Sequence, residues 1–395
     1  MRILSIETSC DETAVSVLDC DGPLEKASFT VLGNALFSQA DLHAPYGGVY
    51  PALAKREHQG NLVPLTRKAL SDASLLSQEA RLVDSAVLAG MREEAFRTET
   101  KNFLESYATP KIDLVAVTKG PGLEPALWTG INFAEALGKT WNTPVFGIDH
   151  MEGHIVSGLL EEIIQEKKFS ISNFRFPLLA LLISGGHTEL VLMKEWFVYE
   201  NIGRTKDDAV GEAFDKVARL LELPYPGGPK IEEAAARSRE RVADAGGELD
   251  IRFPRPLLND GSYDFSFSGL KTAVLYKLRA MDEISERDKE EIAHAFEDAA
   301  RDVLVEKTSR AVQDLKPGAV VVGGGVSANR EIRQALENML RTASSETKLL
   351  LPPTVLTGDN AIMIGAAAYL RFLAGKKGDA NLSALGNVRL EESNA

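Results

Sequence analysis

Two histidines stand four residues apart in the segment His150-Met-Glu-Gly-His154. A helix that begins near Asp149 would place both on one face, because residues i and i+4 are neighbours on a helix surface. Two imidazoles on one face can bind the same divalent cation, so the spacing predicts half of a metal site. The chain has only six histidines among 395 residues, which makes a chance pair less common. Helix capping or hydrogen bonding within a core is the alternative use of such a pair.

The pair lacks the arrangement of a zinc protease. In the protease motif His-Glu-x-x-His the general base directly follows the first histidine, whereas Glu152 lies two residues after His150. The sequence therefore disfavours a hydrolytic metalloprotease.

The composition is that of a soluble globular protein, with 44% hydrophobic and 26% charged residues. No apolar run approaches the roughly 20 residues that span a bilayer. The first residues, Met-Arg-Ile-Leu-Ser-Ile-Glu, reach an acidic side chain too early for a secretion signal. Two cysteines, Cys10 and Cys20, fit free thiols in a reducing compartment better than a disulfide. We expect a cytoplasmic protein.

The formal net charge is −13, which opposes non-specific binding to nucleic acid. A nucleic-acid substrate would have to be bound by a local basic patch or with the help of a partner.

The order of predicted elements repeats along the chain. Strand, polar turn and strand occur first over residues 2–18 and again over residues 178–193. A strand that enters a glycine-rich turn before a helix also occurs twice, at residues 112–122 and 319–329. Near-continuous apolar strands such as Leu178–Ile183 are typical of sheets covered on both faces. We therefore expect a duplicated α/β fold of two lobes, with glycine turns lining an interlobe cleft where backbone amides can bind a phosphate.

A series of short motifs follows in a family-specific order. They are Ser5-Ile-Glu-Thr-Ser-Cys-Asp-Glu-Thr13, Tyr46-Gly-Gly-Val-Tyr-Pro51 with Arg56-Glu-His58, Gly120-Pro-Gly-Leu123, His150-x3-His154, Ser184-Gly-Gly-His-Thr188, Asp207 to Lys216, Tyr225-Pro-Gly-Gly-Pro229, Phe265 to Lys271, Gly323 to Asn329 and Gly358-Asp-Asn-Ala361. In this order, from Met1 to about Leu373, the chain resembles the TsaD family.

The resemblance implies a duplicated actin-like fold of the sugar kinase and Hsp70 type. The first lobe would comprise residues 1–148 and about 357–385, with a helical insertion at about 71–110. The second lobe would comprise residues 149–356, followed by a C-terminal tail at 386–395. The activity it implies is transfer of threonylcarbamoyl from threonylcarbamoyl-AMP to N6 of adenosine 37, in tRNAs that read codons starting with A.

The resemblance also implies a ligand set for one metal ion, formed by His150, His154 and Asp359. Taken alone, Asp359 could equally be the N-cap of the helix that follows it. Two imidazoles and one carboxylate leave coordination positions open for a substrate oxygen. Iron and zinc both accept these ligands, so we expect Fe²⁺ or Zn²⁺.

The family pattern places the adenylate against a further set of positions, which are Leu182, Ile183, Ser184, Gly185, Gly186, Asp215, Gly228 and Asn329. Asp215 could instead pair with Lys216 or Arg219 on its own helix. Asp11 matches the acidic residue that the family needs for activity, where it could orient the adenine amine or assist loss of its proton. Glu12, His58 and His187 are further candidates without a defined role. The implied partners are tRNA, a TsaB-like paralogue and a TsaE-like ATPase.

The chain departs from the family pattern in two places. Residues 71–110 form an insertion that we expect to be helical around Glu79–Leu104 and packed on the surface, and Glu124–Trp128 replaces smaller residues. Two other functions remain open at this stage. One is an ATP-dependent kinase or ATPase on the same fold, and the other is a non-catalytic nucleotide-binding subunit.

Overall fold

The computed structural model describes residues 1–392 apart from 164–165, 344–345, 377 and 379–380. The chain divides into two compact units. Unit 1 comprises Met1–Gln39, Val49–Asn173 and Gly358–Ala395, and unit 2 comprises Ala40–Gly48 and Phe174–Thr357. Each unit has its own sheet and its own hydrophobic core.

The units do not divide at residue 149, where the lobe boundary was expected. Residues 149–173 belong to unit 1 because β6 (Leu160–Ile163) and β7 (Lys168–Ile171) extend its sheet, where β7 pairs with β3 (Ser28–Ser38). Residues 40–48, which include the four-residue helix α1 (Ala40–His43), belong to unit 2. Short polar edge strands carry little sequence signal, which explains the misplaced boundary.

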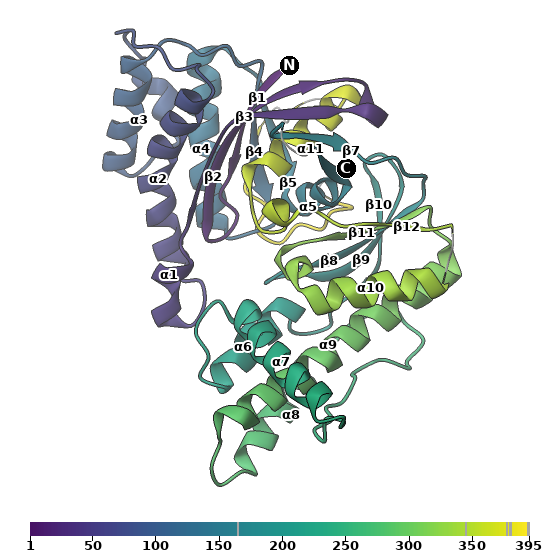
Figure 1. The fold of residues 1–395 in the computed structure, drawn as a ribbon. Coiled ribbons are helices and arrows are strands. Elements are labelled where there is room, and N and C mark those ends of the chain that lie inside the picture. Colours follow the sequence, from purple (N-terminus) through teal and green to yellow (C-terminus); the bar gives the residue numbers. More distant parts are fainter. Residues whose placement is uncertain (164–165, 344–345, 377, 379–380, 393–395) are drawn as a thin grey trace. The chain divides into compact units, whose positions relative to one another are not determined.

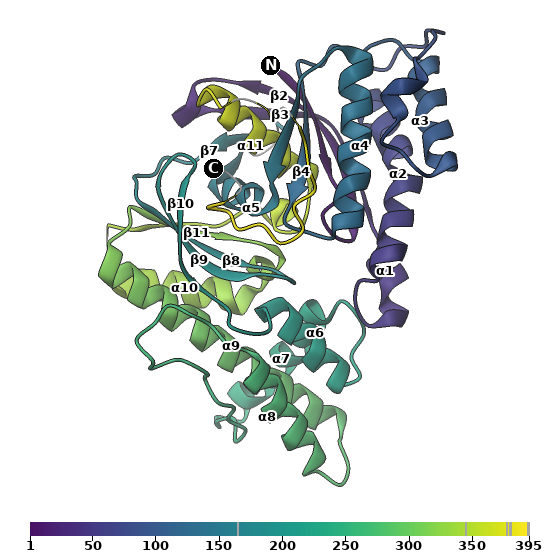
Figure 2. The same ribbon diagram turned by 180° about the vertical axis from the view of Figure 1, so that it is seen from behind.

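Unit 1 is built on a seven-stranded sheet in the order β5-β4-β1-β2-β3-β7-β6. Its other strands are β1 (Arg2–Glu7), β2 (Glu12–Asp21), β4 (Leu114–Gly120) and β5 (Val145–Asp149). Helices α2 (Pro51–Asp72) and α4 (Glu124–Trp141) cover one face, and α11 (Ala361–Leu373) covers the other, where α5 (His150–Leu159) packs on α11 (Figures 1 and 2).

The two faces of β1 explain this arrangement, because successive side chains of a strand point to opposite faces. Leu4 and Ile6 belong to the core cluster beneath α2 and α4. Ser5 lies against Gly365 of α11, where an added Cβ would approach Ser5 Oγ to 2.9 Å. Glu7 shares the face of Ser5, so this acidic side chain points toward the α5 and α11 side of the sheet.

Unit 2 has a five-stranded sheet in the order β10-β9-β8-β11-β12. The strands are β8 (Leu178–Ile183), β9 (Thr188–Glu195), β10 (Val198–Arg204), β11 (Ala319–Gly323) and β12 (Lys348–Leu350). The helices are α6 (Val210–Leu220), α7 (Gly227–Asp244), α8 (Ser268–Arg279), α9 (Glu286–Leu315) and α10 (Arg330–Ala343). The core of this unit joins one face of β8 and β11 to these helices (Figure 1).

The two sheets share one topology, which confirms the predicted duplication. Numbered in chain order, the first five strands of unit 1 lie in the order 3-2-1-4-5, and the added β7 and β6 lie beyond the third strand. The five strands of unit 2 also lie in the order 3-2-1-4-5. In both, the first strand pairs antiparallel with the second and parallel with the fourth. A repeated mixed sheet of this order is the actin-like arrangement.

The insertion differs from the expected surface helix. After the end of α2 at Asp72, only α3 (Glu94–Ser106) and the short 3₁₀ turn η3 (Ser85–Leu88) are helical there. Residues 79 and 81 instead donate backbone hydrogen bonds to the carbonyls of Ser106 and Glu105. Apolar side chains of the segment join the core of unit 1, namely Leu88, Met91, Phe96, Phe103 and Leu104. The insertion is therefore part of the folded core and not an attachment to it.

The C-terminal segment also packs on unit 1. Leu385 N donates to Lys119 O at 2.8 Å, and Gly386 O accepts from Gly122 N at 3.0 Å, so this segment covers the turn after β4. Leu390 is buried, and residues 393–395 of the expected tail lie outside the described part of the chain.

Cys10 and Cys20 are free thiols, as predicted. Burial raises the pKa of both thiols. None of the helices in the described part of the chain combines the length and the apolar character needed to cross a membrane.

Candidate functional site

The two histidines predicted to bind metal lie on the first turns of α5. Asp149 begins this helix, because its Oδ1 accepts hydrogen bonds from Met151 N at 2.8 Å and from Glu152 N at 3.2 Å. The helix therefore starts at His150, and His154 follows one turn later. The two rings lie edge to face, with centroids 4.6 Å apart, and both are buried. The i, i+4 prediction is confirmed.

Asp359 completes the cluster from a segment that is distant in the sequence. Its Oδ1 lies 3.4 Å from His150 Nε2 and 3.2 Å from His154 Nε2. The cap of α11 is the neighbouring Asn360, whose side chain accepts from Met363 N at 2.9 Å. Asp359 is thus not the N-cap, and its carboxylate faces the two rings. One ligand atom from each of the three residues lies within 4.8 Å of the others.

The donor set fits a metal ion. Imidazole nitrogen and carboxylate oxygen are the ligands that iron and zinc accept. Among the described residues, neither ring nitrogen of His154 makes a well-formed hydrogen bond, although the ring is fully buried and Nε2 lies 3.2 Å from Asp359 Oδ1. Burying an imidazole without well-formed hydrogen bonds is costly, and a cation bound at Nε2 would lower that cost.

The pKa shifts within the cluster also favour a bound cation. Burial disfavours a protonated His150, but the carboxylates of Asp359 and Glu7 outweigh burial and raise its pKa well above the ordinary value. Burial lowers the pKa of His154. Burial would raise the pKa of Asp359, but the two imidazoles outweigh it and hold this pKa well below its usual range. A proton on His150 therefore takes the place that a cation could fill.

This competition predicts a pH dependence of metal affinity. Because the pKa of His150 is raised, the ring carries a second proton at any pH below that value, and the cation must displace this proton. We expect the apparent dissociation constant for Zn²⁺ to rise roughly tenfold per pH unit as the pH falls below this pKa. Competition with a chromophoric chelator over a pH series measures it. An affinity that does not change with pH would contradict a site at His150.

Glu7 was not singled out by the sequence, yet it contacts the site. Its Oε2 lies 3.1 Å from His150 Nδ1 and accepts from Thr118 Oγ1 at 2.6 Å. Its Oε1 accepts from Ser9 N at 2.5 Å. The signal in the sequence is an acidic residue at the end of a strand that also contains Ile3, Leu4 and Ile6, and this carboxylate is fully buried.

The turn that bears Asp11 lies beside the same cluster. Burial raises the pKa of Glu12 well above its ordinary value, and the nearby carboxylates of Asp11 and Asp359 raise it further. His58 of α2 contacts both ends of this turn, since its Nε2 donates to Cys10 O at 2.9 Å and its Nδ1 lies 2.7 Å from Thr13 Oγ1. His58 therefore helps to position this turn, and the effect of Asp359 on Glu12 places the turn near the candidate ligand Asp359.

Six of the predicted adenylate residues of unit 2 lie at or just after the ends of β8 and β11, and the other two, Asp215 and Gly228, lie on α6 and α7. Leu182 and Ile183 have buried side chains, so they can offer a ligand only their backbone. Gly185 and Gly186 are exposed, and an added Cβ at either would meet nothing within 4 Å. Gly324 lies against the end of β8, because a Cβ there would approach Ile183 O to 2.4 Å, and its φ of +93° favours glycine. Ligands of open α/β sheets bind at such strand ends.

The side chain of Asp215 contacts the helix that follows its own. Its Oδ1 accepts from Gly227 N at 2.7 Å at the start of α7. Lys216 pairs with Asp208 and Glu212, and Arg219 donates to Gly47 O. Asp215 and Gly227 line a cavity of about 420 Å³ within unit 2. Gly228 follows in the first turn of α7, and a Cβ there would meet no atom within 4 Å.

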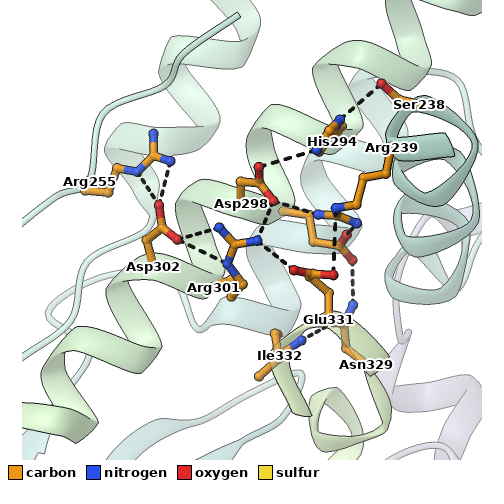
Figure 3. A network of polar contacts seen from close by, with 11 residues as sticks. Ser238, Arg239, Arg255, His294, Asp298, Arg301, Asp302, Asn329, Glu331 and Ile332 are labelled. Atoms are coloured by element: carbon orange, nitrogen blue, oxygen red, sulfur yellow. Dashed lines mark hydrogen bonds and ion pairs between the residues drawn. The ribbon is translucent and has the colours of Figure 1, made fainter. Parts of the chain in front are cut away.

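The side chain of Asn329 is engaged in a network of polar contacts (Figure 3). Its Oδ1 accepts from Ile332 N at 2.9 Å, which caps α10, and its Nδ2 donates to Glu297 Oε1 at 2.6 Å. Glu297 is fully buried and also binds Arg239 of α7 at 2.6 Å. Both ends of the Asn329 amide thus serve the fold, and the network ties the loop after β11 to α7.

His187 lies in the turn after β8, where its backbone N donates to Ser184 Oγ at 3.1 Å.

Together, the duplicated sheet topology and the buried cluster of two histidines and one aspartate define an actin-like protein with a candidate metal centre. The sequence model described as "TsaD: tRNA N6-adenosine threonylcarbamoyltransferase" matches residues 30–84 and 100–366. The chain belongs to this family. The unmatched residues between these two ranges lie within the insertion.

Relatives with that name extend over almost the whole chain. The tRNA N6-adenosine threonylcarbamoyltransferase of Bacillus subtilis is 40% identical over 96% of this chain and 92% of its own. That of Staphylococcus epidermidis is 39% identical over 98% and 97%, and that of Thermosipho africanus is 36% identical over 99% and 100%. A solved hexokinase of the ROK type from Thermus thermophilus covers 95% of the chain with a TM-score of 0.40, at 11% identity. This score is low, so the fold is assigned from the strand order of the two sheets.

Proposed function

We propose that this protein transfers the threonylcarbamoyl group from threonylcarbamoyl-AMP to N6 of adenosine 37, in tRNAs that read codons starting with A. The observation that carries the proposal is the convergence of His150, His154 and Asp359 in a chain that matches the family nearly end to end. A kinase acting on a small substrate would have no evident use for this buried cluster.

The roles of the residues follow from their chemistry. His150, His154 and Asp359 would hold one Fe²⁺ or Zn²⁺ ion, which acts when bound as a Lewis acid on the carbonyl and phosphate oxygens of the acyl donor. Asp11 accepts a hydrogen bond from the incoming adenine amine, which orients its lone pair toward the carbonyl carbon and assists loss of its proton.

Unit 2 would bind the adenylate. The exposed Ser184-Gly185-Gly186 turn presents backbone amides to the phosphate. The Asp215 carboxylate accepts a hydrogen bond from Gly227 N and would also accept one from a ribose hydroxyl. Leu182 and Ile183 contribute backbone groups, Gly228 allows a close approach of α7, and Asn329 fixes the loop after β11.

The charge of the chain bears on its partners. A net charge of −13 disfavours unaided binding of tRNA. We propose that a TsaB-like paralogue and a TsaE-like ATPase assist tRNA binding and turnover, and that the reaction takes place in the cytoplasm.

Reconstitution tests the proposed activity. The chain would be mixed with its TsaB-like and TsaE-like partners, a source of threonylcarbamoyl-AMP and unmodified tRNA, and the nucleosides analysed by mass spectrometry. We expect threonylcarbamoyladenosine with A37 tRNA and none with the matched G37 tRNA. Transfer of the γ-phosphoryl group of ATP to a sugar without tRNA would identify a kinase instead and overturn the proposal.

A further inference from the structure

We propose that Glu7 selects the tautomer of His150 that binds the cation, and that this is why an acidic residue ends β1. The inference rests on the proposed metal role of His150. Glu7 does not reach the cation itself in this proposal, so it is a positioning residue that acts through His150.

The contacts of His150 distinguish its two ring nitrogens. Nδ1 faces Glu7 Oε2 at 3.1 Å, and Nε2 faces Asp359 Oδ1 at 3.4 Å. A neutral imidazole has one N–H donor and one lone pair. If Glu7 takes the hydrogen bond from Nδ1–H, the lone pair is left on Nε2, which is the nitrogen that points toward the other two ligands.

The surroundings of Glu7 leave its carboxylate no other role than that of an acceptor. Ser9 N can only donate, and it lies 2.5 Å from Oε1. Thr118 Oγ1 lies 2.6 Å from Oε2, the same oxygen that faces His150. Both groups hold the carboxylate in place, and its buried position prevents water from replacing it. Metal-ligating histidines are commonly oriented by such a carboxylate, and loss of it typically costs 10–100-fold in affinity.

The variant Glu7→Gln makes a sharp prediction because an amide has one acceptor and one donor end. Ser9 N–H requires the acceptor end, so the NH₂ group must face Thr118 and His150. Thr118 can adapt by turning its hydroxyl toward Ile6 O, which is 3.5 Å away. His150 must then accept at Nδ1 and carry its proton on Nε2, where it blocks the cation.

Two measurements on the full-length protein test the inference without an activity assay. In metal-free protein labelled with ¹⁵N-histidine, at a pH where the ring is neutral, we expect His150 to carry its proton on Nδ1 in the wild type and on Nε2 in Glu7→Gln. In chelator competition, we expect Zn²⁺ to bind Glu7→Gln about 10–100-fold more weakly. A merely structural role would leave the tautomer unchanged.

Matched variants keep the test decisive. Thr118→Val removes one donor but leaves the carboxylate, so the wild-type tautomer and a far smaller loss of affinity are expected. If Glu7→Gln does not fold, the shorter pair Glu7→Asp and Glu7→Asn repeats the comparison of acid with amide. An Nδ1–H tautomer with wild-type zinc affinity in the amide variant overturns the inference. Wild-type zinc affinity in His150→Ala would instead overturn the metal role of His150 itself.

Discussion

A protein that carries both His150→Ala and His154→Ala is expected to form no detectable threonylcarbamoyladenosine in the reconstituted reaction. The double substitution leaves only the carboxylate of Asp359 from the cluster. A single carboxylate does not hold a catalytic cation, and Lewis-acid stabilisation supplies several kcal/mol of a barrier. Since 1.36 kcal/mol corresponds to a factor of ten, the rate should fall by roughly 10³-fold or more.

Metal content must be measured on the same preparations. We expect one ion per chain in the wild type and none in the double variant. The control is His294→Ala, which removes a buried imidazole of unit 2 that contacts Ser238 and Asp298, and it should retain the ion. Circular dichroism would show whether the double variant is folded. Wild-type yields of modified nucleoside from a folded, metal-free double variant would show that the cation has no part in the transfer.

The duplicated fold could be predicted from the sequence because its central strands are apolar and buried on both faces. The run Leu178–Ile183, for example, is fully buried as β8, and β4 of unit 1 is also buried over its whole length. The unit boundary was missed because β6 and β7 are short and partly exposed, so only their pairing with β3 reveals to which sheet they belong.

The insertion shows how a long-range contact overrides local propensity. Its composition, rich in alanine, glutamate and arginine, favours a helix from Glu79. The backbone from Glu79 to Arg81 instead pairs with the end of α3, and Arg81 Nε donates to Leu104 O at 2.7 Å. The helix therefore begins only at Glu94. Helix propensity is a local property of the sequence, so it could not predict this pairing with the end of α3.

The candidate site was only partly accessible from the sequence. The spacing of His150 and His154 predicts their common face, because it is a local property of a helix. Asp359 lies more than two hundred residues away along the chain, so its place beside them was implied only by the family motifs. Glu7 and Asn329 show what the motifs alone did not predict. Both stand in recognised motifs, but only their contacts show that one orients His150 and that the other caps α10.

The largest loss of stability is expected from Arg371→Met. Arg371 of α11 forms two hydrogen bonds with Glu152 of α5, one of them at 2.9 Å, and both side chains are buried. Methionine keeps much of the apolar volume but removes the cation, which leaves a buried carboxylate without its arginine. Breaking a buried pair in this way costs about 3–5 kcal/mol. Urea denaturation followed by circular dichroism measures the loss, and Arg287→Met, which removes an exposed pair with Glu291, should change stability little.

The double variant Arg371→Met, Glu152→Met separates packing from charge. Replacing both partners of a buried pair with apolar groups is often close to neutral, so the double variant should recover most of the lost stability. Helix α5 carries the two candidate histidine ligands and Asp359 lies just before α11, and Gly153 packs so closely on α11 that an added Cβ would lie 3.1 Å from Met363 and Ile364. We therefore expect zinc affinity to fall in Arg371→Met and to recover with stability in the double variant. If affinity stayed at the wild-type value while stability fell, the crossing of α5 and α11 would not depend on this ion pair, and Gly153 together with the Glu7–His150 contact would be sufficient to align the ligands.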